Sequence, residues 1–120
     1  MGERVKRVAI LGSTGSVGTQ TLDVVRSFPG ELRAVALAAG RNDKLLQEQI
    51  REFRPRYVHS GNGLLPQSDG VTQVSDLEQL ATLPEVDIVV VATVGFKQLF
   101  VLVIVLTEYS IRAGARGGIG

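Results

Sequence analysis

Three evenly spaced glycines, set between an apolar run and an amphipathic segment, constrain this chain more than any other feature. Residues 12–18 read GSTGSVG and directly follow the continuous apolar run at residues 8–11. After the turn, residues 17, 21, 24, 25 and 28 fall on one helical face. Pro29 and Gly30 then end the helix. The pattern predicts a buried strand, a tight turn and a helix, in that order, over residues 6–28.

The same alternation continues to residue 92. Residues 32–38, 56–59 and 87–92 read as strands, and 71–74 as a small one after a loop at 60–70. A second helix is expected over residues 42–53, capped by Asn42 or Asp43, and a third opens with the capping-box pattern S-x-x-E at 75–78. Strands that alternate with helices favour an α/β fold. We expect a Rossmann-like parallel sheet with helices on both faces, incomplete at this chain length.

Composition excludes several other classes of protein. With 120 residues the chain is at most one ordinary domain, and 44% hydrophobic residues are enough for a core. Thirteen basic against twelve acidic residues do not indicate a nucleic-acid partner, and the absence of cysteine excludes disulfides and thiolate metal sites. The sequence shows neither a membrane span nor a signal-peptide core, so a cytoplasmic location is expected.

The glycine turn predicts a phosphate site. Pyrophosphate requires backbone N–H groups that no side chain obstructs, and the positive end of a helix dipole stabilises it. Thr14 and Ser16 add hydroxyl donors to these amides. Because the turn lies between a strand and a helix, a dinucleotide site is favoured over an ordinary tight turn.

The turn after the second strand indicates which dinucleotide binds. A site for NAD places an acid there, about 20 residues beyond the glycines, to bind the ribose 2′-hydroxyl. This chain has Gly40, Arg41 and Asn42 instead. An arginine can form charge-assisted hydrogen bonds to a 2′-phosphate, which favours NADPH. The alternative is that Arg41 is a solvated cation and Asn42 only a helix cap.

No other residue predicts chemistry. His59 is the single histidine and has no cysteine or second histidine to complete a metal site. Tyr57 and Tyr109 lack the lysine four residues on that a short-chain dehydrogenase requires, and Asp87 reads as a turn residue before its strand. We therefore expect neither catalytic residues nor metal ligands within this chain.

Taken together, these stretches resemble the N-terminus of the 1-deoxy-D-xylulose 5-phosphate reductoisomerases. The similarity covers roughly residues 4–95 and depends on GSTGSVG, TLDVV at 21–25, AGRN at 39–42, FRPRY at 53–57 and DIVVVATVG at 87–95. It implies an NADPH-dependent oxidoreductase of isoprenoid biosynthesis that rearranges and reduces a sugar phosphate with Mg²⁺ or Mn²⁺. The cofactor contacts that it implies are Thr14, Gly15, Ser16, Val17, Gly40, Arg41 and Asn42.

After Gly95 the quoted motifs no longer match. The family continues with a helix and an Ala-Asn-Lys-Glu-Ser segment, and its metal ligands lie beyond. Here residues 96–106 are almost entirely aliphatic, and residues 112–120 are rich in glycine. We therefore divide the chain into a cofactor-binding region, 1–95, and a tail, 96–120. The apolar part of the tail is expected as a further strand of the parallel sheet beside residues 87–92, or as the seam of a homodimer.

Two other functions stay open from the residues alone. One is a non-catalytic nucleotide-binding or interaction module, whose tail docks on a partner. The other is the cofactor-binding half of a semialdehyde or acyl-phosphate reductase, which has similar glycine turns. The resemblance favours the NADPH-binding portion of a reductoisomerase, inactive when alone.

Overall fold

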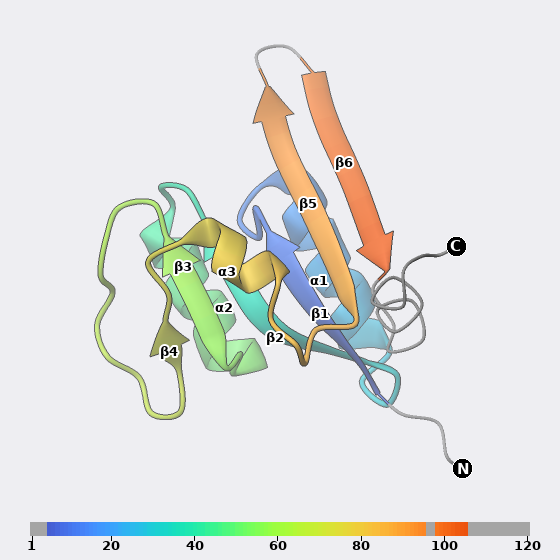
Figure 1. Cartoon of the computed structure of the whole chain (residues 1–120), viewed down its shortest axis with the longest axis horizontal. Coiled ribbons are helices and arrows are strands. Elements are labelled where there is room, and N and C mark those ends of the chain that lie inside the picture. Colours follow the sequence, from blue (N-terminus) through green and yellow to red (C-terminus); the bar gives the residue numbers. More distant parts are fainter. Residues whose placement is uncertain (1–4, 96–97, 106–120) are drawn as a thin grey trace, which may run out of the picture.

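The computed structural model describes residues 5–95 and 98–105, which form one sheet flanked by helices (Figure 1). The sheet has six strands in the order β4-β3-β2-β1-β5-β6. Within the described residues, no helix has the length and apolar character needed to cross a bilayer. The elements are β1 (Lys6–Leu11), α1 (Ser16–Ser27), β2 (Leu32–Ala39), α2 (Asp43–Phe53), β3 (Tyr57–Ser60), β4 (Thr72–Gln73), α3 (Leu77–Ala81), β5 (Ile88–Gly95) and β6 (Gln98–Val105).

The five strands β1 to β5 are parallel, which confirms the predicted α/β class. β1 is the central strand and pairs with β2 on one side and β5 on the other. The chain therefore builds outward from β1 through β2 and β3, and returns to the opposite side of β1 to form β5. In open α/β sheets, ligands bind outside the carboxyl ends of the strands at such a reversal. The glycine turn follows β1 at that point.

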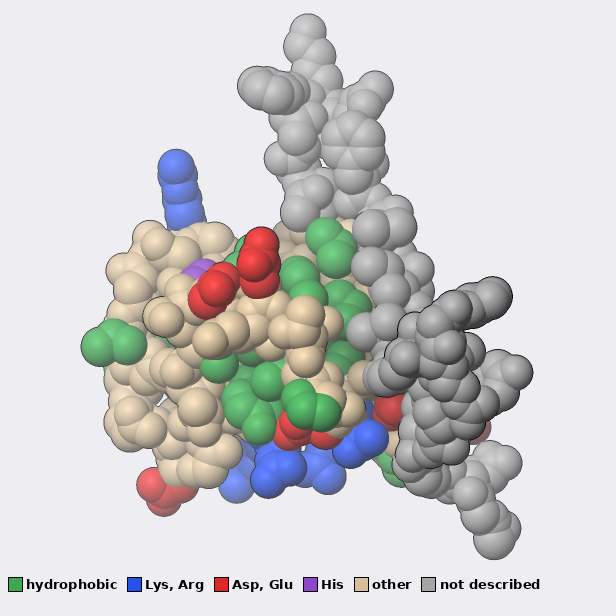
Figure 2. Space-filling model, in the orientation of Figure 1, with side chains coloured by type: hydrophobic (Ala, Val, Ile, Leu, Met, Phe, Trp, Pro, Cys, Tyr) green, Lys and Arg blue, Asp and Glu red, His purple; other side chains and the backbone are tan. Residues whose placement is uncertain are grey.

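Helices cover the two faces of the sheet unequally. On one face, α1 contributes Leu22 and Val25 to a core that also contains Leu46 and Ile50 of α2. On the other face, the single turn of α3 places the fully buried Leu80 against β1 and β2. Figure 2 shows apolar side chains at the surface of this second face, over β5 and below α3. Helices on both faces are thus confirmed, and the thin cover of one face fits the expected incomplete domain.

Two details of the predicted helices are wrong. The buried stripe of α1 is Gly18, Leu22 and Val25, whereas Val24 and Phe28 are about half exposed. Apolar residues occur on more than one side of this helix. Because Gly18 has no side chain, the side that carries it can approach the turn most closely, and this side is the one that is buried. The cap of α3 is Asp76, whose carboxylate accepts a hydrogen bond from the Glu78 amide at 3.0 Å, and not Ser75.

Residues 98–105 of the tail join the sheet as β6, beside β5 as expected, and β6 runs antiparallel to β5. All eight residues of β6 pair with β5 in antiparallel register, from Gln98 opposite Gly95 to Val105 opposite Ile88. Only residues 96 and 97 separate the two strands, and a parallel connection requires a crossover of roughly a dozen or more residues. The glycine-rich residues 112–120 lie outside the described residues. The division at Gly95 stays a prediction.

Deletion of residues 96–120 should lower the melting temperature and promote self-association. Without β6, the edge of β5 exposes its backbone N–H and C=O groups, and open apolar edges pair with other chains. Thermal melting and size-exclusion chromatography of both forms measure this. Equal melting temperatures and the same oligomeric state would show that β6 neither completes the sheet nor covers an edge.

Candidate functional site

The glycine turn is fixed to the strands on both sides of β1. The amides of Gly12 and Ser13 both donate to the carbonyl oxygen of Ala38 in β2, each at 2.8 Å. Gly12 has a φ of +101°, which favours glycine, and its α-carbon packs against β5. A β-carbon at Gly12 would lie 2.0 Å from the carbonyl oxygen of Ala92. The turn therefore requires glycine at its first position for packing as well as for conformation.

The three glycines have different roles. Gly18 is buried, and a β-carbon there would lie 2.0 Å from the carbonyl oxygen of Gly12. Gly15, by contrast, is exposed, and the nearest atom to a β-carbon there is the Gly12 oxygen at 3.8 Å. Gly12 and Gly18 thus close the turn onto the sheet, while Gly15 leaves open space above it. Of the three, the middle glycine is the exposed one, and its surface is open to a ligand.

The open space lies at the amino end of α1. Gly15 is the N-cap residue, in an extended conformation, and it provides no side chain to cap the first-turn amides. The first turn of α1 contains no acidic residue, so nothing there opposes a bound anion. In the part of the chain that the structure describes, the hydroxyls of Thr14 and Ser16 have no hydrogen-bond partner either. Amides and hydroxyls are both available to a phosphate.

The second turn follows β2 at the same edge of the sheet. Leu11 pairs with Ala38, so the carboxyl ends of β1 and β2 lie side by side and bring Gly40 and Arg41 to the edge that carries Gly15. Asn62 fixes this turn, because its Nδ2 donates to the carbonyl oxygen of Arg41 at 2.8 Å. The Arg41 side chain is exposed and has no partner within the described residues. The seven predicted contact residues are thus gathered at one edge.

Asn42 has a structural role in addition. Its Oδ1 accepts a hydrogen bond from the Leu45 amide at 3.1 Å and caps α2, as the sequence predicted. The cap uses only the oxygen of the side-chain amide. Its Nδ2 remains a free donor within the described residues, so capping and ligand binding do not exclude each other.

A buried pair of polar side chains ties the glycine turn to α2. Ser13 Oγ donates to Gln49 Oε1 at 2.8 Å, and Gln49 Nε2 donates to the Ser13 carbonyl oxygen at 2.9 Å. Ser13 is fully buried and Gln49 nearly so. Sequence reasoning did not find this contact, because a glutamine in a helix reads as a surface residue. The available signal was the spacing of Leu46, Gln49 and Ile50, which places Gln49 on the same helix face as two apolar residues.

The same edge continues into a hollow at the end of β3. It has a volume of about 470 Å³, and its lining includes His59, Gly61 and Gln73. Gly61 packs so closely on the second turn that a β-carbon there would lie 2.5 Å from the Gly40 oxygen. His59 is half-buried, with Nδ1 at 2.8 Å from the Val74 carbonyl oxygen, which fits the structural role expected for it. The hollow itself was not predicted.

Asp87 lies at the opposite edge, away from the turn. Its buried carboxylate accepts a hydrogen bond from the Arg7 amide at 2.8 Å and forms an ion pair with the Arg7 side chain at 3.3 Å. It joins the amino ends of β1 and β5, as a turn residue would. Among the described residues, no group of three or more His, Asp or Glu side chains is placed to hold a metal ion.

The parallel sheet, the reversal at β1 and the open glycine turn define a Rossmann-like nucleotide-binding class of domain. The sequence profile described as 1-deoxy-D-xylulose 5-phosphate reductoisomerase matches residues 8–115, and so extends past Gly95 into the tail. The chain belongs to this family. The alternative readings, an interaction module or another reductase, are not favoured by these matches.

Curated relatives carry the same description. The reductoisomerase of Acaryochloris marina is 45% identical over 93 residues, which cover 76% of this chain and 23% of the relative. That of Anaeromyxobacter sp. (strain K) is 67% identical over 54 residues, or 45% of this chain and 14% of the relative. This chain spans about a quarter or less of the length of such relatives.

Solved structures agree with the fold. A crystal structure of DOX-P reductoisomerase with NADPH, fosmidomycin and magnesium superposes with a TM-score of 0.59 at 26% identity, covering 69% of this chain and 23% of the other. A second, with magnesium, gives a TM-score of 0.56 at 30% identity, covering 69% of this chain and 24% of the other.

Replacement of Gly18 by alanine should destabilise the fold far more than the same change at Gly15. The new methyl group at position 18 would meet the Gly12 carbonyl oxygen, a backbone atom that cannot move aside, whereas at position 15 it meets open space. We expect a loss above about 3 kcal/mol for Gly18→Ala and less than about 1 kcal/mol for Gly15→Ala. Urea denaturation measures both, and equal losses would contradict the assigned roles.

Gln49→Ala should lower the free energy of unfolding by about 1–3 kcal/mol, because it leaves the buried hydroxyl and carbonyl of Ser13 without partners. Gln47→Ala, on the same helix, is the matched control and should change stability by less than about 0.5 kcal/mol. Denaturant unfolding of the two variants checks this. Similar losses of stability in the two variants would show that the two hydrogen bonds between Ser13 and Gln49, the Ser13–Gln49 clamp, do not stabilise the fold.

Proposed function

We propose that this chain is the NADPH-binding portion of a 1-deoxy-D-xylulose 5-phosphate reductoisomerase. The observation that carries the proposal is the open position of Gly15 above the uncapped first turn of α1. Family membership supports it, as does the related crystal structure whose description names NADPH. The open space is the kind of cradle that a pyrophosphate requires.

Each predicted contact has a distinct part in this proposal. The amides at the start of α1, with Thr14 and Ser16, hold the pyrophosphate, and Val17 lies at the same helix end. Gly40 permits close approach at the second turn, since a β-carbon there would meet nothing within 4 Å. Arg41 pairs with the 2′-phosphate, and the Asn42 amide donates beside it. The hollow at the end of β3 lies beside the second turn and offers a concave surface for the adenine ring.

The bound cofactor supplies hydride for the reduction of a sugar-phosphate substrate, which the rest of such an enzyme would hold. We assign no role to Mg²⁺ or Mn²⁺ within this chain, because its described residues offer no ligand set for a metal ion. We further propose a cytoplasmic location and association as a homodimer. No nucleic acid or membrane is expected as a partner.

The preference for NADPH over NADH should depend on Arg41. Loss of one charge-assisted contact typically weakens binding by about 10- to 150-fold. Calorimetric titration of the parent chain should therefore give a lower Kd for NADPH than for NADH, and Arg41→Ala should remove the difference. Lys44→Ala is the matched control, since it removes an exposed cation from the next helix. Equal affinities in the parent chain would defeat the role of Arg41.

Gly15→Val should abolish binding of both cofactors and leave the fold intact. The backbone at Gly15 has φ −81° and ψ 178°, which valine adopts readily, and a β-carbon there meets no atom closer than 3.8 Å. The added side chain would occupy the space proposed for the pyrophosphate. Circular dichroism verifies folding and calorimetry measures binding. A folded variant that still binds NADPH normally would place the phosphate site elsewhere.

A further inference from the structure

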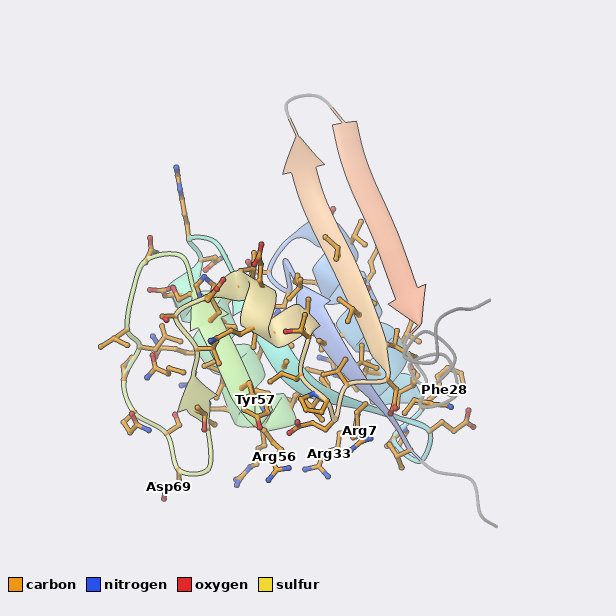
Figure 3. The ribbon with its side chains drawn as sticks, in the orientation of Figure 1. Arg7, Phe28, Arg33, Arg56, Tyr57 and Asp69 are labelled. Carbon is orange, nitrogen blue, oxygen red and sulfur yellow. The ribbon has the colours of Figure 1, made fainter. Side chains whose placement is uncertain are left out.

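Arginines gather at the edge of the sheet opposite the glycine turn. Arg7 lies in β1, Arg33 in β2 and Arg56 just before β3, near the amino ends of these strands. Their side chains project from the same edge, as Figure 3 shows, and Figure 2 shows basic side chains grouped along it. Arg7 and Arg33 are direct partners in the β1–β2 register. Like charges that face each other across strands are destabilising, and Asp87 compensates only Arg7 of this pair.

A hollow of about 530 Å³ opens beside this edge and is lined by four arginines. Arg33 comes from β2, Arg51 and Arg54 from the end of α2, and Arg56 from the segment before β3. Asp69 is the only acidic residue among the described residues of the lining. Two segments of the chain, residue 33 and residues 51–56, therefore contribute cations to a single concavity.

The acids of the described chain compensate little of this charge. Arg56 reaches Glu85 only at 3.8 Å, and its side chain is 66% exposed. Within the described residues, the guanidinium groups of Arg33, Arg51 and Arg54 form neither an ion pair nor a hydrogen bond. All five donors of each guanidinium are thus available to a ligand.

Helix electrostatics explain only part of the cluster. Cations near the carboxyl end of a helix interact favourably with its dipole, which accounts for Arg51 in the last turn of α2 and for Arg54 at its C-cap. The dipole does not account for Arg33 or Arg56, which come from strand segments. The four converge on a hollow of the size typical of small-molecule sites.

We propose that this hollow is a second binding site, for a small molecule that carries a diphosphate group. Guanidinium groups bind phosphoryl oxygens in bidentate geometry, and several arginines suit a ligand with several such oxygens. The concave shape and the formal net charge of only +1 favour a small molecule over a nucleic acid, which requires an extended basic surface. The site is separate from the dinucleotide site and does not rest on it.

Inorganic pyrophosphate is the probe, titrated by calorimetry into the full chain with and without saturating NADPH. NADPH should block any pyrophosphate that binds at the glycine turn and leave the arginine hollow accessible. The double variant Arg33→Gln/Arg51→Gln should weaken the NADPH-insensitive binding by about tenfold or more. Lys6→Gln/Lys44→Gln is the matched control, since it removes two exposed cations that do not line the hollow. Its affinity should stay within about twofold of the parent.

Citrate tests whether the phosphoryl group matters or only the charge, and it should bind more weakly than pyrophosphate. Three results would overturn the proposal: no NADPH-insensitive binding of pyrophosphate, equal affinities in the arginine and lysine double variants, or equal affinities for citrate and pyrophosphate. Failure of the proposed cofactor site has a different signature, because NADPH itself would then fail to bind while the arginine-dependent pyrophosphate signal persisted.

Discussion

The close packing of Gly12 between β2 and β5 is the constraint on which the rest of the structure depends. Two amides of the turn share the Ala38 carbonyl oxygen, and the α-carbon of Gly12 lies so near Ala92 that no side chain fits. This contact fixes the direction in which the chain leaves β1. Gly18 then allows the first turn of α1 to pack on the Gly12 carbonyl. The helix axis, and with it the position of the open amides, follows from these two contacts.

The site therefore depends on backbone geometry more than on reactive side chains. Gly15 leaves space above the amino end of α1, and the Ser13–Gln49 clamp connects the turn below it to α2. α2 begins directly after the second turn, which contains Arg41. The Ser13–Gln49 clamp therefore also fixes the position of Arg41 relative to Gly15. Such rigid placement suits a site that binds and orients a cofactor. Buried polar contacts that a ligand does not touch stabilise the site.

The two edges of the sheet carry opposite arrangements. At the carboxyl ends of the strands, amides and hydroxyls are left open beside one exposed cation, Arg41. At the amino ends, Arg7 pairs with the buried carboxylate of Asp87, and the neighbouring Arg33 forms no ion pair within the described chain. The helical cover is uneven as well, since α3 is the only helix of the described residues that packs on one of the two faces. The chain spans about a quarter or less of the length of the relatives that it matches.

The sequence by itself determined the order of strands and helices, the glycine turn and the residues gathered at the carboxyl edge. These follow from local patterns, since an apolar run, a glycine turn and helical spacing each act over a few neighbouring residues. Tertiary structure alone decided which glycine stays open, because Gly12 and Gly18 meet carbonyl groups that only folding brings near. It also decided the stripe that α1 buries and the antiparallel direction of β6. The arginine hollow was invisible in the sequence, because residues 33 and 56 become neighbours only when β2 and β3 pair.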